Sequence, residues 1–145
     1  MIMVKQLLKG KKADCVCTIT PQDTVYKALE IMAEKNIGAL VVVEKEKIVG
    51  MFSERDYARG VVLKGKSSKD TSVSELMDSN VCYVRPEQTI EECMALFTKK
   101  RVRHLPVLEM EKLVGLVSIG DAVKQYLEDR EFHIQQLENY ITGCY

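Results

Sequence analysis

The stretch GMFSERD at Gly50–Asp56 is followed 65 residues later by GLVSIGD at Gly115–Asp121. Each stretch is typical of an apolar strand that runs directly into a helix, with a serine at the junction. The similarity extends outward from this element, because Thr18–Asp56 aligns with Tyr83–Asp121 without a gap when the sequence is shifted by 65 positions. A repeat of this length indicates two copies of one structural unit.

Each copy predicts the element order β-α-β-β-α. A proline ends a short extended segment, TIT or YVR, and Thr24 or Thr89 then stands at the N-cap of a helix with apolar residues at helical spacing. Two apolar runs separated by EKEK or EMEK predict a hairpin, and their nearly continuous apolarity predicts that both faces are covered. A second helix begins at Ser53 or Ser118. The fold class is therefore α/β (α+β).

The domain boundaries follow from the repeat. We assign residues 1–66 to the first repeat with a short N-terminal helix, residues 67–128 to the second repeat, and residues 129–145 to a helical tail. The sequences VKQLL from Val4 and VSELM from Val73 form a weaker similarity upstream of the two repeats. In the tail, apolar residues continue at spacings of three and four, which predicts burial against the tail's own domain or against another subunit.

The composition argues against several classes of function. Lysine plus arginine and aspartate plus glutamate both number 21, so no overall charge draws the chain to nucleic acid or to an anionic membrane. The longest apolar run, Ile37–Val43, is too short to span a bilayer, and the first ten residues lack the apolar core of a signal peptide. We therefore expect a cytoplasmic protein without a membrane partner.

The five cysteines show no paired spacing and are expected to be reduced thiols. A zinc site formed by Cys15, Cys17 and His104 is disfavoured because the usual ligand spacings are missing. No metal site is predicted.

The repeated Ser-x-x-Asp element has a chemistry suited to a nucleotide. A helix N-terminus attracts phosphate, the serine hydroxyl adds a donor, and an aspartate one turn later accepts the two hydroxyl groups of a ribose. The glycine of the motif is expected to leave room for a flat base. The same letters also fit a helix N-cap that needs no ligand. Because the element occurs twice at equivalent places, we prefer the ligand-binding interpretation.

Each copy also resembles a CBS domain, and the two together resemble a CBS pair, or Bateman module, that stands alone. The resemblance rests on TITP, IGALVV and GMFSERD in the first copy and on YVRP, VRHLPV and GLVSIGD in the second. It implies two repeats packed about a pseudo-twofold axis, with two potential sites for AMP, ADP, ATP, S-adenosylmethionine or NAD(H) in the cleft between them. It further implies a homodimer that regulates a partner protein through conformational or oligomeric change, without catalysis or a catalytic cofactor.

The resemblance also assigns roles to residues. Asp56 and Asp121 would hold ribose hydroxyl groups, and Ser53 and Ser118 would face phosphate or ribose. The other candidate nucleotide-binding residues are Thr18, Gly38, Ala39, Leu40, Arg55, Arg59, Tyr83, Arg103, His104, Leu105 and Gly120. Arginine suits bidentate contacts with phosphate, which favours NAD(H), ADP or ATP over S-adenosylmethionine.

Three alternative functions remain open at this point. GVVLKGKS at Gly60–Ser67 fits the phosphate-binding loop G-x-x-x-x-G-K-[ST], which would indicate an ATPase. Such a loop follows a strand and opens a helix, whereas this segment has a helical pattern and ends in a polar loop, so we interpret the match as accidental. The second alternative is a protein-interaction module whose cleft binds no ligand. Nucleic-acid binding is opposed by the zero net charge.

Overall fold

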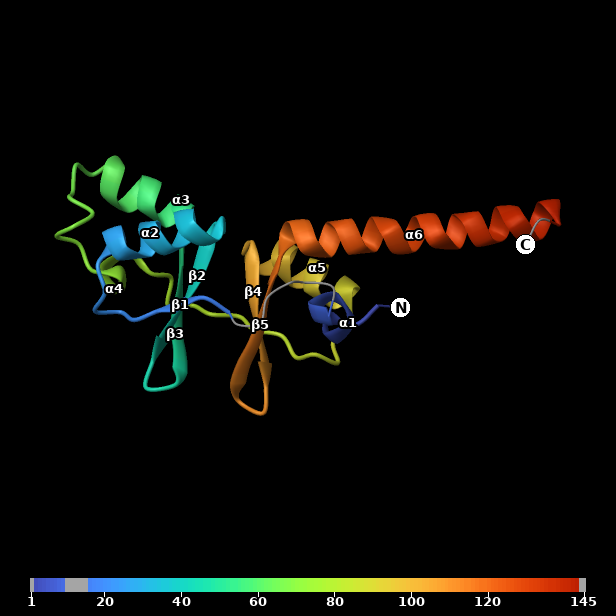
Figure 1. Ribbon diagram of the computed structural model, residues 1–145, viewed down its shortest axis with the longest axis horizontal. Helices are drawn as coiled ribbons and strands as arrows, with labels where there is room; N and C mark the ends of the chain where they lie inside the picture. The colour runs from blue at the N-terminus through green and yellow to red at the C-terminus, as the bar shows by residue number, and fades with distance from the viewer. Residues whose placement is uncertain (1, 10–15, 144–145) are drawn as a thin grey trace. The chain divides into compact units, whose positions relative to one another are not determined.

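A computed structural model describes residues 2–9 and 16–143 of the chain (Figure 1). The elements are α1 (Val4–Lys9), β1 (Thr18–Ile19), α2 (Val25–Lys35), β2 (Ala39–Glu44), β3 (Lys47–Ser53), α3 (Glu54–Tyr57), the π-helix η1 (Ala58–Val62), α4 (Val73–Leu76), α5 (Ile90–Lys100), β4 (His104–Glu109), β5 (Lys112–Ser118) and α6 (Ile119–Thr142). They form two compact units. The first-repeat unit is Cys15–Val81, and the second-repeat unit combines Met1–Asp14 with Cys82–Tyr145.

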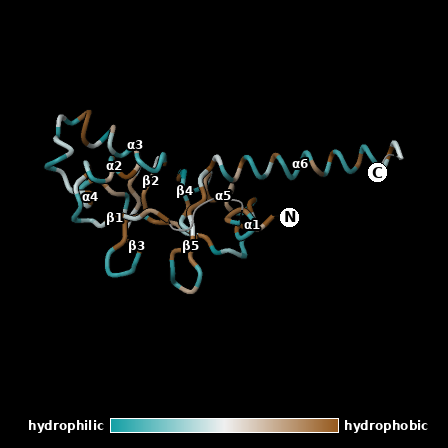
Figure 2. The backbone as a smooth tube through the Cα atoms, viewed as in Figure 1, coloured by the Kyte–Doolittle hydropathy of each residue, from teal (hydrophilic) through white to brown (hydrophobic). Residues whose placement is uncertain are grey.

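The first-repeat unit is a three-stranded sheet with helices packed on it. Strand β1 pairs in parallel with β2, which pairs antiparallel with β3. The core contains Phe52 and Leu40 from the sheet, Met32 from α2 and Val73 from α4. The first four residues of β2 are all buried, as its continuous apolarity predicted, whereas burial alternates along β3. In Figure 2 the strands are mainly hydrophobic and the hairpin turns are hydrophilic.

The second-repeat unit has the same order of elements, but its first strand is shorter than that of the first repeat. Strands β4 and β5 form the hairpin, but the expected first strand is only a single parallel bridge between Val84 and Val107. Val84 donates its amide to Pro106 O and accepts a bond from Leu108 N. Pro106 occupies the place of Val41 in the first repeat and has no N–H. It therefore cannot donate the next bond of the ladder.

Each of the two short helices upstream of a repeat packs on the other repeat. Helix α1 buries Val4 and Leu7 in the core of the second-repeat unit, and α4 buries Val73 in the core of the first. The hydrogen bonds match: Val4 N donates to Gln88 O, and Val73 N donates to Asp23 O. Each unit therefore contains the short helix that precedes the other repeat in the sequence. The units differ in this respect from the predicted division, which placed boundaries after residues 66 and 128.

The first helix of each repeat begins where the sequence predicts. Thr24 and Thr89 are the N-caps of α2 and α5, and their hydroxyl oxygens accept hydrogen bonds from Lys27 N at 3.1 Å and Glu92 N at 3.2 Å. The capping box formed by Thr89 and Glu92 is confirmed. Helix α6 continues without a break past residue 128, at which the sequence-based division separated a tail.

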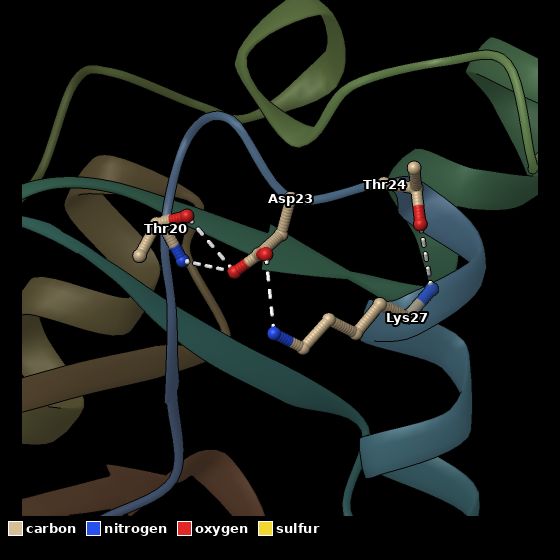
Figure 3. A network of polar contacts seen from close by, with 4 residues as sticks. All are labelled: Thr20, Asp23, Thr24 and Lys27. Atoms are coloured by element: carbon tan, nitrogen blue, oxygen red, sulfur yellow. Dashed lines mark hydrogen bonds and ion pairs between the residues drawn. The ribbon is translucent and has the colours of Figure 1, made fainter.

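A polar network connects β1 to α2 (Figure 3). The Asp23 carboxylate accepts bonds from Thr20 N at 3.0 Å and Thr20 Oγ1 at 2.9 Å, and Lys27 Nζ lies 3.1 Å from its other oxygen. Burial on its own raises the pKa of Asp23, but the bonds from Thr20 and Lys27 together outweigh it and hold the pKa below its ordinary value of 3.8. The network therefore stabilises the charged form of Asp23 in the folded state.

Replacing Asp23 with asparagine is expected to lower the free energy of unfolding by about 1 kcal/mol at pH 7. Because the folded-state pKa is lowered, the charge of Asp23 stabilises the fold above pH 3.8, and this contribution is lost as the pH falls through the lower folded-state pKa. Urea unfolding of the wild type and Asp23→Asn at pH 7 and near pH 3 measures the difference. An equal difference at both values of pH contradicts this explanation.

Candidate functional site

The candidate site of the first repeat lies where β3 meets α3. Ser53 is the last residue of β3 and the N-cap of α3, and Asp56 is the third residue of that helix. Asp56 Oδ2 accepts bonds from Ser53 N at 2.9 Å and Ser53 Oγ at 3.0 Å, while Asp56 N donates to Ser53 Oγ at 3.3 Å. The two side chains therefore form a complete capping box, and Asp56 Oδ1 takes part in none of these bonds.

The second repeat reproduces this arrangement where β5 meets α6. Ser118 is the N-cap of α6, and Asp121 Oδ2 accepts a bond from Ser118 N at 3.1 Å. Asp121 N donates to Ser118 Oγ at 3.1 Å. All four side chains are partly buried, between the core and the surface. The sequence repeat thus places a serine and a carboxylate in the same local geometry twice.

The neighbouring strand is fixed beside each capping box. Ala39 pairs with Ser53 across the hairpin, and His104 pairs with Ser118. The first amide of each following helix also donates backward, from Glu54 N to Gly38 O at 3.1 Å. The equivalent bond of the second repeat, from Ile119 N to Arg103 O, is 3.0 Å long. In the first repeat, the starts of β2 and α3 therefore form one local unit with Ser53 and Asp56. In the second repeat, the starts of β4 and α6 form the same unit with Ser118 and Asp121.

The register decides which side chains share a face of the sheet. Thr18 pairs with Val41, and Val41 pairs with Met51, so these residues lie on the same face as Ala39 and Ser53. Leu40 lies on the opposite face, within the core, and so does Leu105 in the second repeat. Both leucine side chains are fully buried, so only their backbone groups are available to a ligand.

The register places Val41 and Met51 on the candidate face, where the Val41 side chain is fully buried and the Met51 side chain is partly exposed. Neither was singled out from the sequence, because the uniformly apolar run of β2 does not reveal which residues face the core. Only the strand pairing separates the two faces.

The charged candidates differ between the repeats. Arg55 and Arg59 lie on the exposed surface of the α3–η1 segment, and Arg103 is exposed at the turn before β4. Gly120 takes the place of Arg55 in the second repeat, and a Cβ there would meet only Ser118 Oγ, at 3.7 Å. Packing therefore does not require a glycine at position 120. His104 is partly buried, and Tyr83 is 49% exposed.

The glycine that opens each motif has a different role from the one expected. A Cβ on Gly50 would approach Met77 Sδ to 2.9 Å and Asp78 O to 3.0 Å, and one on Gly115 would approach Leu8 Cδ2 to 2.5 Å. Both glycines are buried, Gly50 against the residues that end α4 and Gly115 against α1. They permit close packing of these segments, so the prediction that they leave room for a base was wrong. An open position occurs instead at Gly38, where a Cβ would meet nothing within 4 Å.

The segment Gly60–Ser67 lacks the setting of a phosphate-binding loop. Gly60–Val62 belong to η1, and strand β3 ends at Ser53, with α3 between them. A Cβ on Gly60 would lie 2.5 Å from Leu76 Cδ2, and Val61 is buried in the core. These residues serve packing, which supports the interpretation of the sequence match as accidental.

The cysteines that the structure describes give no indication of a metal site. Cys15, part of the disfavoured zinc site, lies outside the described residues, and residues 2–9 and 16–143 contain no cluster of histidine, cysteine or acidic side chains fit for a metal ion. Burial, with a smaller contribution from the Glu92 carboxylate, raises the pKa of the Cys93 thiol to about 11. Cys93 is therefore a neutral core residue at physiological pH.

The doubled fold and its doubled capping box place the chain in a known family. The chain belongs to the CBS domain family, whose model matches residues 2–62 and again residues 73–128. It is 40% identical over 143 residues to the mitochondrial CBS domain-containing protein CBSX3 of Arabidopsis thaliana, covering 94% of this chain and 69% of that protein. The fold is therefore that of a CBS pair.

Solved structures agree with this assignment. A protein with CBS domains from Burkholderia ambifaria is 53% identical with a TM-score of 0.83, over 88% of this chain and 95% of that one. The CBS domain pair of protein MJ0100, solved with 5′-methylthioadenosine and S-adenosyl-L-methionine, has a TM-score of 0.77 at 21% identity, over 89% and 98% of the two chains. At that identity, the second likeness shows the fold alone. None of the helices in the described part of the chain is long and apolar enough to cross a membrane.

Proposed function

We propose that this CBS pair is a regulatory module that binds an adenine nucleotide, AMP, ADP, ATP or NAD(H), and catalyses no reaction. The observation that carries the proposal is the occurrence of the same serine–aspartate geometry in both units, at 2.9–3.3 Å in the first repeat and 3.1 Å in the second. The complex of the MJ0100 CBS pair with two adenosine derivatives supports a ligand of this class.

The carboxylate is the group that would recognise the sugar. A ribose offers two adjacent hydroxyl donors, and in the first repeat Asp56 uses Oδ2 for Ser53 while Oδ1 takes part in none of those bonds. The Ser53 hydroxyl already donates to Asp56, so donation to a phosphate would require this hydroxyl to rotate. Ribose recognition is therefore the first role of the site, and phosphate contact at the serine is secondary.

Phosphate recognition is assigned to the exposed arginines. Arg55 and Arg103 carry planar donors that match phosphate oxygens in pairs, and Arg59 lies one turn after Arg55. The two repeats differ here, because Gly120 replaces Arg55 and Arg103 replaces Gly38. We propose that the two sites bind with unequal affinity and that ligands with two or more phosphates bind best.

Regulation would follow from differential binding. A ligand that binds one arrangement of the protein more tightly shifts the population toward that arrangement. We propose that a partner protein responds to this shift, that the module acts as a homodimer, and that it works in the cytoplasm.

The substitutions Asp56→Asn and Asp121→Asn test the proposed site. Asparagine keeps an acceptor for the serine amide but removes the charge that holds a ribose hydroxyl, so affinity is expected to fall by about 10- to 100-fold at the altered site. Calorimetric titration with AMP, ADP, ATP, NAD⁺ and S-adenosylmethionine measures the effect. Glu92→Gln is the matched control, because Glu92 forms the capping box at the start of α5 and belongs to neither of the two Ser-x-x-Asp motifs.

Two results count against the proposal. If both aspartate variants keep full affinity, the ribose assignment is wrong. If no compound produces heat or raises the melting temperature of the wild type, the chain is the interaction module without a ligand. That result agrees with capping boxes whose only role is to begin α3 and α6.

A further inference from the structure

The distal half of α6 contacts little of its own unit. Residues 131–138 are all exposed, and the helix extends beyond α1, α5 and the β4–β5 hairpin of the second-repeat unit (Figure 1). Its apolar side chains Leu127, Ile134, Leu137 and Ile141 are between 54% and 81% exposed. An isolated helix of this length is only marginally stable in water, so this half requires a partner that covers its apolar side.

The spacing of these residues identifies the kind of partner. Leu127, Ile134 and Ile141 are seven residues apart, and Leu137 lies between the last two at a spacing of three and four. These are the a and d positions of a heptad, which form the narrow seam of a coiled coil and not the broad face of a core helix. Val123 and Arg130 take the other d positions.

The surface of this helix outside the seam carries polar pairs together with the exposed aromatic side chains of Phe132 and Tyr140. Gln135 donates to Asn139 at 3.0 Å on the side away from the seam, and His133, at a g position beside the seam, lies 3.7 Å from Asp129. The aliphatic side chains of this half thus form a single stripe, which fits one partner helix.

We propose that residues 123–141 pair antiparallel with the same segment of a second copy of the chain. In this alignment Leu127 faces Leu137 of the second copy, and Val123 faces Ile141. Arg130 then faces Ile134. A parallel pair would instead place Arg130 against Arg130 in the seam, where two like charges repel each other.

Charge complementarity supports the antiparallel alignment. Lys124 and Glu138 both occupy e positions and are exposed. Antiparallel helices bring e positions together, so each Lys124 approaches Glu138 of the other copy, and the twofold symmetry creates this pair twice. The two Glu131 side chains meet at the centre, where Arg130 of each copy lies beside them. This pairing is independent of any nucleotide.

The first experiment measures the oligomeric state of the full chain by analytical ultracentrifugation. The wild type is expected to be a dimer, and Ile134→Glu with Leu137→Glu is expected to raise the dimer dissociation constant at least about 100-fold. Phe132→Glu is the matched control, because Phe132 is 61% exposed on the outer surface and its replacement should leave the dimer intact. A monomeric wild type, or a dimer that the double variant leaves unchanged, overturns the proposal.

The second experiment determines the orientation by exchanging charges. Glu138→Lys alone should weaken the dimer because it brings two lysines together, and adding Lys124→Glu should restore it in the antiparallel alignment. A parallel pair does not bring these positions together, so the second change would not restore the dimer. Failure of this rescue refutes the antiparallel pairing. Loss of nucleotide binding in the aspartate variants has no bearing on either result.

Discussion

Replacing Phe52 with alanine is expected to lower the free energy of unfolding by about 3–5 kcal/mol. Phe52 is the largest fully buried side chain among the described residues, and it lies in the core of the first-repeat unit as the next-to-last residue of β3. The substitution removes apolar contacts and leaves a cavity, which the packed neighbours fill only in part. Because Phe52 precedes Ser53, the loss should also loosen the junction that holds the first capping box.

Phe132→Ala provides the control for this effect, because it removes the same side chain from the surface of α6. Its expected cost is within about 0.5 kcal/mol. Urea unfolding followed by circular dichroism gives both values, and hydrogen exchange locates the change in β2 and β3. Equal costs for the two variants would show that Phe52 does not hold the core together.

The local elements were predictable because their determinants lie close together in the sequence. A threonine N-cap needs only the next three residues, and both Thr24 and Thr89 cap helices as expected. The pairing of Ser53 with Asp56 depends on the same short spacing, so the doubled motif alone is enough to locate the candidate site. The role of that pairing does not follow from the motif, because a capping box and a ribose site use the same atoms.

The hairpin turns show why some local geometry was not predictable. Each hairpin closes with two residues at positive φ, Lys45 at 50° and Glu46 at 64° in the first repeat, and Met110 at 51° and Glu111 at 64° in the second. Turns of this kind favour asparagine and glycine, and here charged or long side chains adopt them. Pairing of the flanking strands imposes the conformation, and residue preference alone does not reveal that constraint.

Long-range packing was the second limit on the sequence-based prediction. The apolar pattern of VKQLL predicts a helix with one buried side but does not say which sheet buries it. The same uncertainty explains the wrong interpretation of Gly50 and Gly115, whose neighbours are Met77, the C-cap of α4, and Leu8 of α1. The sequence alone does not distinguish a glycine that leaves room for a packed helix from a glycine that leaves room for a base.

Leu7→Ala is expected to destabilise the second-repeat unit by about 2–5 kcal/mol, although Leu7 precedes the first repeat in the sequence. Its side chain is buried in one core with Val84, Phe97 and Leu105. Hydrogen exchange should therefore accelerate in β4, β5 and α5, and amides of β2 and β3 should keep their protection.

Leu63→Ala is the matched control, because Leu63 is exposed after η1 and its loss should change neither set of amides. The opposite pattern, with faster exchange in β2 and β3 after Leu7→Ala, would place α1 with the first repeat and refute the exchange of helices. The expected pattern has a further consequence for the site at Ser118. Leu8 of the same helix contacts the position of Gly115, three residues before Ser118, so loosening α1 releases the strand that positions the second capping box. The sequence that precedes the first repeat thereby supports the candidate site of the second.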